Sequence, residues 1–422
     1  MRKIKSPYHT YEKITANFCN VLTAITRSLG AMYSMKREVL QDELEKQFKW
    51  FHAHPELSYE EYETTKRIKQ LLQEKSIEIV DLPLETGLVA IIRGKKSGPV
   101  IALRGDIDAL PVQEETFLAW KSKEYGKMHA CGHDFHLTTI YGAAILLKEM
   151  EDEIHGTIKL IFQPAEESSL GALKIIETGI LEDVSAIFGI HSASNFPVGT
   201  LGIKEGAMMA AVDRFQITLK GFGTHAASPH SGKDPIVATA ALINAAQTIV
   251  SRNINPFSAG LLSITHVVAG NTWNVIPETA FIEGTVRTLV KKERLFFEKR
   301  LRELAEFIGK AYEVAVEVKW IAGPPATNND PKWTAFAKNL AREEGIAVEV
   351  SQPSLGGEDF AFYQELTKGL FIQIGTGETY PNHHPKFQVD PKALSGGAEY
   401  LSLLSKKALL ALKERTEGYD TN

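Results

Sequence analysis

The sequence has very little cysteine: only Cys19 and Cys131 occur among 422 residues. Two cysteines cannot form the disulfide framework of a small secreted domain, so we expect the protein to work in the reducing cytoplasm. Because thiols stay reduced in that compartment, Cys131 is free to bind a metal or to act as a nucleophile.

Long apolar runs and an excess of basic residues are also absent. No run reaches the roughly 18 apolar residues that a membrane-spanning helix requires. There are 47 Lys and Arg against 52 Asp and Glu, which gives a formal charge of −5 and a pI near 6.3. This balance offers no basic surface to nucleic acid or to an anionic membrane. We therefore expect neither as a partner, and a small molecule as the ligand.

Residues 1–34 begin with a basic stretch and continue with a short apolar one, a pattern that faintly resembles a signal peptide. Arg27 interrupts the apolar stretch, and no A-x-A cleavage site follows it. We interpret these residues as an N-terminal extension rather than as a secretion signal.

Short apolar runs alternate with helical patterns over residues 35–212. The runs LVAIIRG, PVIALRGD, TIKLIFQP and SAIFGIH are typical of strands that are buried on both faces of a parallel sheet. Their alternation with helices predicts a doubly wound α/β domain. In such a domain the ligand site lies at the carboxyl ends of the strands.

The pattern changes over residues 213–324, where the order becomes strand, helix, strand, strand, helix, strand. This order predicts a ferredoxin-like α+β domain inserted into the first one. The α/β pattern resumes over residues 325–412, so we expect a discontinuous catalytic domain. Residues 413–422 are expected to form a tail.

The segment KMHACGHDFH is unusually rich in metal-binding side chains. Cys131 and His133 are two residues apart, and Gly132 between them permits a tight turn that points both side chains to one side. The pair can therefore share a metal ion, although a buried structural cysteine and histidine would show the same spacing. We assign no role to the nearby His136.

Two further predicted strands end in acidic or imidazole groups. Glu166 and Glu167 follow the run TIKLIFQP, and His191 ends the run SAIFGIH. Adjacent carboxylates repel each other unless a cation lies beside them. Because parallel strands place their carboxyl ends at one edge of the sheet, we expect these three side chains to lie near Cys131.

His383 and His384 follow the last predicted strand, LFIQIGTG. A donor set of one thiolate, three imidazoles and one carboxylate suits a pair of hydrolytic metal ions. Such donors favour Zn²⁺, Mn²⁺, Co²⁺ or Ni²⁺ over Mg²⁺ or Ca²⁺, without selecting one of the four.

Several motifs occur in an order and spacing that resemble the peptidase M20 family. They are RGDIDALP, MHACGHDFH, QPAEE, GIH, GTHAASPH, NVIPETAFIEGTVRT, GGEDFAFY and HHPKF. More narrowly, the chain resembles the amidohydrolase branch, which includes N-acyl-amino-acid amidohydrolases, hippurate hydrolases and auxin-conjugate hydrolases. The resemblance runs from about Met35 to the last helix and implies two divalent metal ions, an N-acyl amino acid substrate and a homodimer formed through the inserted domain.

The resemblance also implies roles for individual residues. Glu166 matches the general base of the family, Asp108 an aspartate that orients a metal-bound imidazole, and His225 a histidine that stabilises the oxyanion. The implied metal ligands are Cys131 as the bridging ligand, His133, Glu167, His191 and His383. The implied substrate-binding residues are Asn274, Arg287 and His230, and in related dimers such groups reach the neighbouring subunit's site.

Three alternatives remain open from the sequence. Other branches of the family are dipeptidases and aminopeptidases, but they usually have HxD where this chain has RGDID, and a bridging aspartate in place of Cys131. In a thiol hydrolase, Cys131 would be a nucleophile that needs no metal. A non-enzymatic binding protein would keep the fold but is expected to have lost the base or a ligand, and no such loss is found here.

Overall fold

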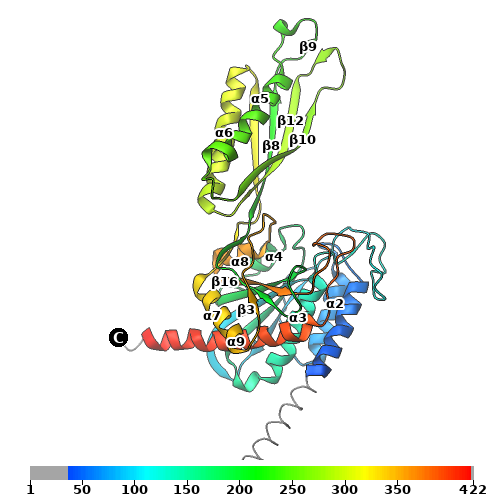
Figure 1. The fold of residues 1–422 in the computed structure, drawn as a ribbon, viewed down its shortest axis with the longest axis vertical. Helices are drawn as coiled ribbons and strands as arrows, with labels where there is room; N and C mark the ends of the chain where they lie inside the picture. The colour runs from blue at the N-terminus through cyan, green and yellow to red at the C-terminus, as the bar shows by residue number, and fades with distance from the viewer. Residues whose placement is uncertain (1–36, 420–422) are drawn as a thin grey trace, which may run out of the picture.

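The structure is a computed structural model that describes residues 37–419, so the predicted extension over residues 1–34 lies outside the described residues. Two lobes are connected by a narrow waist (Figure 1). Residues 211–322 form the small lobe, and the remaining described residues form the large lobe. In the described part of the chain, no helix combines the length and the hydropathy needed to cross a bilayer.

The large lobe is built on one eight-stranded sheet with the order β1-β2-β4-β3-β5-β16-β6-β15. Its strands are β1 (Glu78–Ile79), β2 (Leu88–Arg93), β3 (Lys96–Asp106), β4 (His155–Gln163), β5 (Val184–Ala193), β6 (Leu201–Gly202), β15 (Val348–Glu349) and β16 (Gly369–Gly375). The central strands β4, β3, β5 and β16 run parallel to one another, as predicted. The run LVAIIRG also forms a strand, β2, but it pairs antiparallel with β4, so the prediction of a parallel strand was wrong there. A small second sheet pairs β7 (Gly206–Met209) with β14 (Thr327–Asn329).

Helices cover both faces of this sheet, which explains why its central strands are mostly apolar. One face is covered by a helix over residues 37–53 and by α2 (Tyr62–Glu74), α3 (His133–Glu149), α7 (Pro331–Glu343) and α9 (Ala393–Tyr419). The other face is covered by α4 (Gly171–Glu177) and α8 (Phe360–Leu366). Neighbouring residues point to opposite faces, so Leu103 packs in the first core and Ala102 in the second. Helix α9 continues to Tyr419, into residues that we expected to form a tail.

The small lobe has the strand order β10-β12-β8-β13, and all its neighbouring strands are antiparallel. Its elements are β8 (Ala211–Lys220), α5 (Pro235–Thr248), β10 (Gly260–Ala269), β12 (Thr279–Thr288), α6 (Lys291–Ala311) and β13 (Ala315–Ala322). The Asp234 side chain starts α5 by accepting the Ile236 N–H, ahead of Pro235 in the first turn. This confirms the predicted ferredoxin-like arrangement.

A two-stranded ribbon of β9 (Thr224–His225) and β11 (Val275–Ile276) forms the far tip of the small lobe. The tip is therefore the part of the small lobe that lies farthest from the large sheet (Figure 1).

Candidate active site

Polar side chains gather at the carboxyl edge of the large sheet, as expected for an open parallel sheet. Strand β3 ends at Asp106 and β4 ends at Gln163, just before Glu166 and Glu167. His191 lies near the end of β5. Because these strands are neighbours, residues far apart in the chain meet at one edge.

The turn before α3 presents Cys131 and His133 to this edge. Gly132 has a φ of +88°, a left-handed conformation that suits glycine. A Cβ atom at this position would also lie 2.5 Å from Ser192 Oγ. Glycine is therefore required both by the conformation of the turn and by its close approach to β5.

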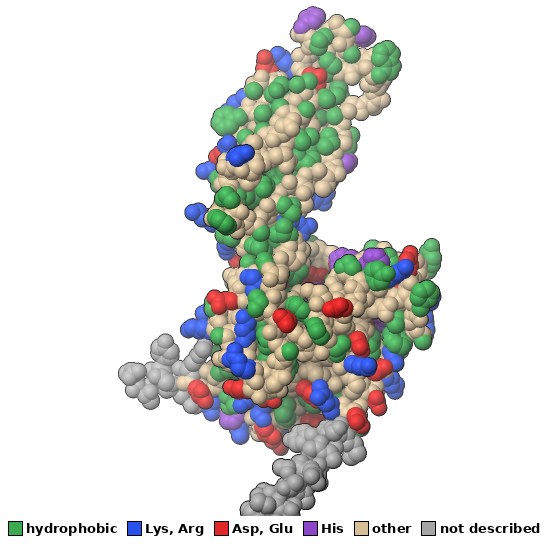
Figure 2. Space-filling view, viewed as in Figure 1, with side chains coloured by type: hydrophobic (Ala, Val, Ile, Leu, Met, Phe, Trp, Pro, Cys, Tyr) green, Lys and Arg blue, Asp and Glu red, His purple; other side chains and the backbone are tan. Residues whose placement is uncertain are grey.

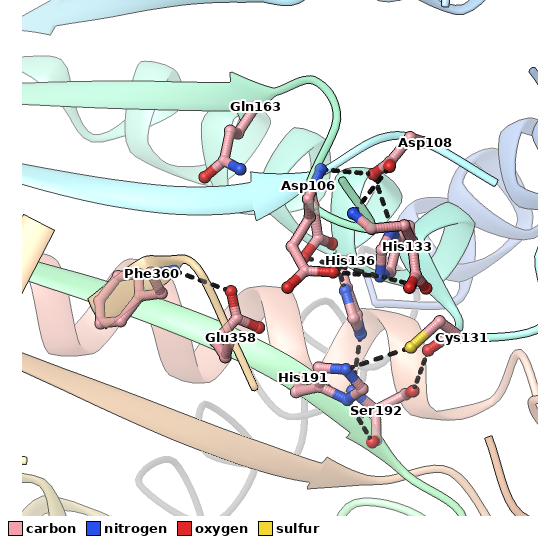
Figure 3. A network of polar contacts seen from close by, with 12 residues as sticks. Asp106, Asp108, Cys131, His133, His136, Gln163, His191, Ser192, Glu358 and Phe360 are labelled. Carbon is pink, nitrogen blue, oxygen red and sulfur yellow. Dashed lines mark hydrogen bonds and ion pairs between the residues drawn. The ribbon is translucent and has the colours of Figure 1, made fainter. Parts of the chain in front are cut away.

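The five predicted metal ligands lie together. Ligand atoms of Cys131, His133 and His191 are all within 4.8 Å of one another, and so are those of Cys131, Glu167 and His383. Figure 3 shows Cys131, His133 and His191 converging from the α3 turn and from β5. Cys131 belongs to both groups, and a further group of His133, Glu166 and Glu167 connects them.

The unsatisfied atoms of this cluster suit cations. His133 Nδ1 lies 3.1 Å from Asp108 Oδ1, and His133 Nε2 is buried with no hydrogen-bond partner within residues 37–419. Glu167 Oε1 is also buried and accepts no hydrogen bond from the described residues, although His383 Nε2 lies 3.4 Å away. His191 Nδ1 donates to the carbonyl of Ser192 at 2.8 Å, which leaves Nε2 facing Cys131 Sγ at 3.5 Å. Buried polar atoms are rarely left unpaired, and metal ions would bind these atoms.

The electrostatics of the cluster also favour bound cations. Burial raises the pKa of Glu166 well above its ordinary value, and the neighbouring carboxylates Glu358, Asp359 and Glu167 raise it further. Burial alone would raise the pKa of Cys131, but the adjacent His191 and His133 hold it well below its ordinary value. The thiol is therefore disposed to be a thiolate, the form that binds metal.

Asp108 is the centre of a second set of contacts. Besides His133, it accepts hydrogen bonds from the Ser58 hydroxyl at 2.7 Å and from the N–H groups of Glu166 and Glu167 at 3.1 Å and 3.0 Å. One buried carboxylate therefore holds the imidazole of His133 and the backbone of both glutamates.

His136 lies inside the site, although the sequence analysis assigned it no role. Its Nδ1 lies 2.5 Å from Asp106 Oδ1, and its Nε2 accepts the N–H of Ser192 at 2.7 Å. Burial lowers the pKa of His136 to about 4, so the ring is neutral and donates through Nδ1. The available signal was its three-residue spacing from His133, which places both rings on one side of α3.

Arg104 was also missed, because it stands within an apolar strand pattern. The guanidinium is fully buried under the site. It donates to Asp106 at 2.7 Å, to Glu358 at 2.9 Å and to Asp359 at 2.8 Å. Its Nε donates to Gln163 at 2.7 Å. Arg104 thus balances three carboxylates that lie beneath the candidate ligands.

A cavity of about 480 Å³ opens over the cluster, and Cys131, Glu166, His191 and His383 line it. Arg287 from β12 reaches the same cavity at the waist between the lobes. It is the one predicted substrate-binding residue that a single chain brings to the site.

The other predicted small-lobe residues lie elsewhere. His225, His230 and Asn274 are at or beside the far tip, where His225 pairs with Val275 in the ribbon. None of these three lines the cavity over Cys131. Figure 2 shows histidines at the tip of the small lobe and others, well separated, on the large lobe. One chain alone therefore does not assemble the complete predicted site.

His383 and its neighbour His384 have different environments. His383 has a φ of +70°, and its Nε2 lies 3.4 Å from Glu167 Oε1. His384 stacks on Tyr380 at 4.4 Å between ring centroids and belongs to none of the donor groups found among the described residues. His383 therefore lies in the donor cluster, whereas His384 packs against an aromatic ring.

Known proteins resemble this chain over most of its length. It is 48% identical to the N-acetylcysteine deacetylase of Bacillus subtilis, over 86% of this chain and 96% of that protein. It is 38% identical to the IAA-amino acid hydrolase ILR1-like 4 of Arabidopsis thaliana, over 86% and 85% of the two chains.

Solved structures extend the likeness to the fold. One of them is a Bacillus subtilis protein described as a dinuclear metal binding peptidase from the M20 family. It is 44% identical, with a TM-score of 0.81 over 88% of this chain and 99% of that chain. The model of peptidase family M20/M25/M40 matches residues 102–407. The chain belongs to peptidase family M20/M25/M40, in its amidohydrolase branch.

Proposed function

We propose that this protein is a binuclear metal-dependent amidohydrolase that cleaves N-acyl amino acids to a carboxylic acid and a free amino acid. The observation that carries the proposal is the donor cluster with Cys131 common to two groups, next to the buried Glu166 and under a cavity that contains Arg287. The names of the relatives support amide substrates of this kind.

The proposed ligands are Cys131, His133, Glu167, His191 and His383, and the ions are two of Zn²⁺, Mn²⁺, Co²⁺ or Ni²⁺. When bound, two such ions supply Lewis acidity towards a water molecule and towards the acyl carbonyl oxygen.

Glu166 is the proposed general base. Its raised pKa suits a group that takes a proton from water and later returns it to the leaving amine. Asp108 keeps the proton of His133 on Nδ1 and holds Glu166 and Glu167 through their backbone N–H groups. Neither role of Asp108 requires it to contact the substrate.

Arg287 is proposed to bind the substrate carboxylate, because a planar guanidinium makes two parallel hydrogen bonds to such a group. Asn274 and His230 are proposed to bind the substrate, and His225 to donate to the developing oxyanion. Because these three residues lie at the tip of the small lobe, they would act in the pocket of a second subunit. A homodimer formed through the small lobe is therefore part of the proposal.

This arrangement predicts complementation between two inactive variants. His225→Ala and Glu166→Ala homodimers should each lose activity, because neither has a pocket with both groups. Co-production with two different affinity tags should yield mixed dimers that carry one intact pocket. Random pairing makes about half of the dimers mixed, so the total should recover about a quarter of wild-type activity. No recovery in purified mixed dimers would contradict a contribution of His225 from the second subunit.

A cytoplasmic location is proposed on the scarcity of cysteine. Cys131, the cysteine within the described residues, is buried and free of any disulfide. A thiol that must bind metal is best kept in a reducing compartment.

The proposed function is tested with metal-free protein and a panel of N-acetyl and N-benzoyl amino acids. Release of free amino acid is followed while Mn²⁺, Co²⁺, Ni²⁺ or Zn²⁺ is added. We expect release only with metal, and a single preferred acyl group. A dipeptide panel run in parallel separates the amidohydrolase from a peptidase of the same family.

Two outcomes would replace the proposal. Hydrolysis that persists in chelator but stops on alkylation would make Cys131 a nucleophile, with His191 at 3.5 Å as its partner. Binding of acyl amino acids without hydrolysis under any metal would favour a binding protein.

A further inference from the structure

The proposed mechanism leaves one buried carboxylate near the site unused. Glu61 is fully buried, and it stands at the residue that precedes α2. A short polar side chain in this position normally accepts the first N–H groups of its own helix. Here Glu56 accepts those of Glu63 and Thr64 at 3.1 Å and 2.8 Å, and Glu61 makes no such bond.

The side chain of Glu61 contacts the active-site turn instead. Its Oε1 accepts the N–H of Ala165 at 2.8 Å, across more than a hundred residues of sequence. Ala165 is directly before Glu166 and has a φ of +55°. A non-glycine residue in this left-handed region is strained and persists only where its surroundings hold it.

Three consecutive N–H groups in this turn are bound by buried carboxylates. Glu61 accepts from Ala165, while Asp108 accepts from Glu166 at 3.1 Å and from Glu167 at 3.0 Å. The carbonyl of Ala165 accepts the Ser168 hydroxyl at 2.8 Å. The N–H and the carbonyl of Ala165 are therefore both hydrogen-bonded. Among the described residues, Glu61 supplies the only side chain that accepts the N–H.

Removing the Glu61 carboxylate from water costs free energy, so its burial calls for a specific structural role. Burial raises the pKa of Glu61 to about 7. Its second oxygen, Oε2, has no hydrogen-bond partner among the described residues, and the contact of the carboxylate with Thr86 lowers the pKa by less than burial raises it. An apolar side chain would anchor α2 without this desolvation cost, so packing alone does not account for a carboxylate here.

We propose that Glu61 is a positioning residue that holds Ala165 in its left-handed conformation and thereby aims the carboxylate of Glu166 at the reacting water. This inference rests on the proposed role of Glu166 as the general base. Without Glu61, Ala165 relaxes towards negative φ, which rotates the peptide that leads into Glu166. Asp108 holds the N–H groups of both glutamates, so the change acts mainly on the direction of the Glu166 side chain, which is adjacent to Ala165. Glu167 is less affected, because it is one residue farther from Ala165.

The test compares Glu61→Leu with Glu61→Gln in the full-length, metal-loaded protein. Glu63→Leu is the matched control, since Glu63 is on the same helix with its side chain 65% exposed. A misplacement of about 1 Å costs about 100-fold in rate, so we expect kcat of Glu61→Leu to fall about 100-fold. KM and the binding of two metal ions should change less than about threefold. Glu61→Gln keeps an acceptor for Ala165 and should retain kcat within about tenfold.

Hydrogen exchange supplies a measurement that does not depend on catalysis. Peptides covering residues 161–170 should exchange at least about tenfold faster in Glu61→Leu than in wild type, Glu61→Gln or Glu63→Leu. If Glu61→Leu does not fold, the comparison of Glu61→Gln with Ala165→Gly decides the matter. Glycine adopts a positive φ without strain, so Ala165→Gly is added to Glu61→Gln in a double variant. The kcat and the exchange rate of the double variant should be nearly those of wild type.

Wild-type exchange and kcat in Glu61→Leu would overturn the inference. The inference would also be overturned if adding Ala165→Gly to a Glu61 variant left its lowered kcat and its faster exchange unchanged. A wild-type protein that hydrolyses no acyl amino acid would contradict the proposed function, while the exchange experiment would still test the contact.

Discussion

Glu166→Gln is expected to lower kcat about 1,000-fold while both metal ions remain bound. Glutamine keeps the size of the side chain but cannot take a proton, and proton transfer by a positioned base contributes about 100- to 10,000-fold. The expected effect lies within that range because burial and three neighbouring carboxylates raise the pKa of Glu166 well above its ordinary value, which suits a base. Single-turnover kinetics together with metal analysis of the same samples measures it.

The matched control is Glu167→Gln, the adjacent residue. Both glutamates occur in groups of possible ligands, but among the described residues only Glu167 shares a group with Cys131 and His383. Its loss should therefore lower the metal content together with the rate. Glu166→Gln should also raise the thermal stability of the metal-free protein, since it removes one charge next to Glu358 and Asp359. If metal content and rate fell together in Glu166→Gln, Glu166 would be a ligand rather than a base.

Arg104→Met is expected to destabilise the large lobe by about 3–5 kcal/mol, the cost of removing one partner from a buried ion pair. Three carboxylates, Asp106, Glu358 and Asp359, would remain buried without their cation. Urea denaturation of the metal-free protein, followed by circular dichroism, measures the change in the free energy of unfolding.

Arg93→Met is the control for this substitution. Arg93 pairs with Glu78 on the surface, where an ion pair contributes about 0–1 kcal/mol. Arg104→Lys should fall between the two, because a lysine keeps the charge but cannot donate to several carboxylates at once. A loss below about 1 kcal/mol in Arg104→Met would show that the three carboxylates are protonated or solvated, and that Arg104 does not balance them.

The order of apolar runs predicted the parallel sheet and the inserted domain because both depend on local patterns. Strands buried on both faces require continuous apolar residues, and the βαββαβ order follows from the sequence of elements. The candidate ligands were predictable for a related reason. Glu167 and His191 each follow or end a predicted strand, and neighbouring parallel strands end at one edge. Cys131 was recognised instead from its spacing to His133 across Gly132.

Residues whose partners are distant in sequence were not predictable. Arg104 donates to Glu358, 254 residues away, and Glu61 accepts from Ala165, 104 residues away. From its sequence neighbours alone, Arg104 looks like a polar residue that interrupts an apolar strand. Glu61 looks like the residue at which a helix begins. His136 was missed for the same reason, since its contact with Ser192 exists only after α3 packs against β5.

The sequence by itself determined the fold class, the family and the set of metal-binding donors, because these depend on residue type and on the order of elements. Only the tertiary structure decided which buried charges balance one another and how the glutamate turn is held. It also separated Arg287, which reaches the cavity, from His225, which lies at the far tip. The physical reason is that pairing of charges and aiming of side chains depend on distances across the fold, which no local pattern encodes.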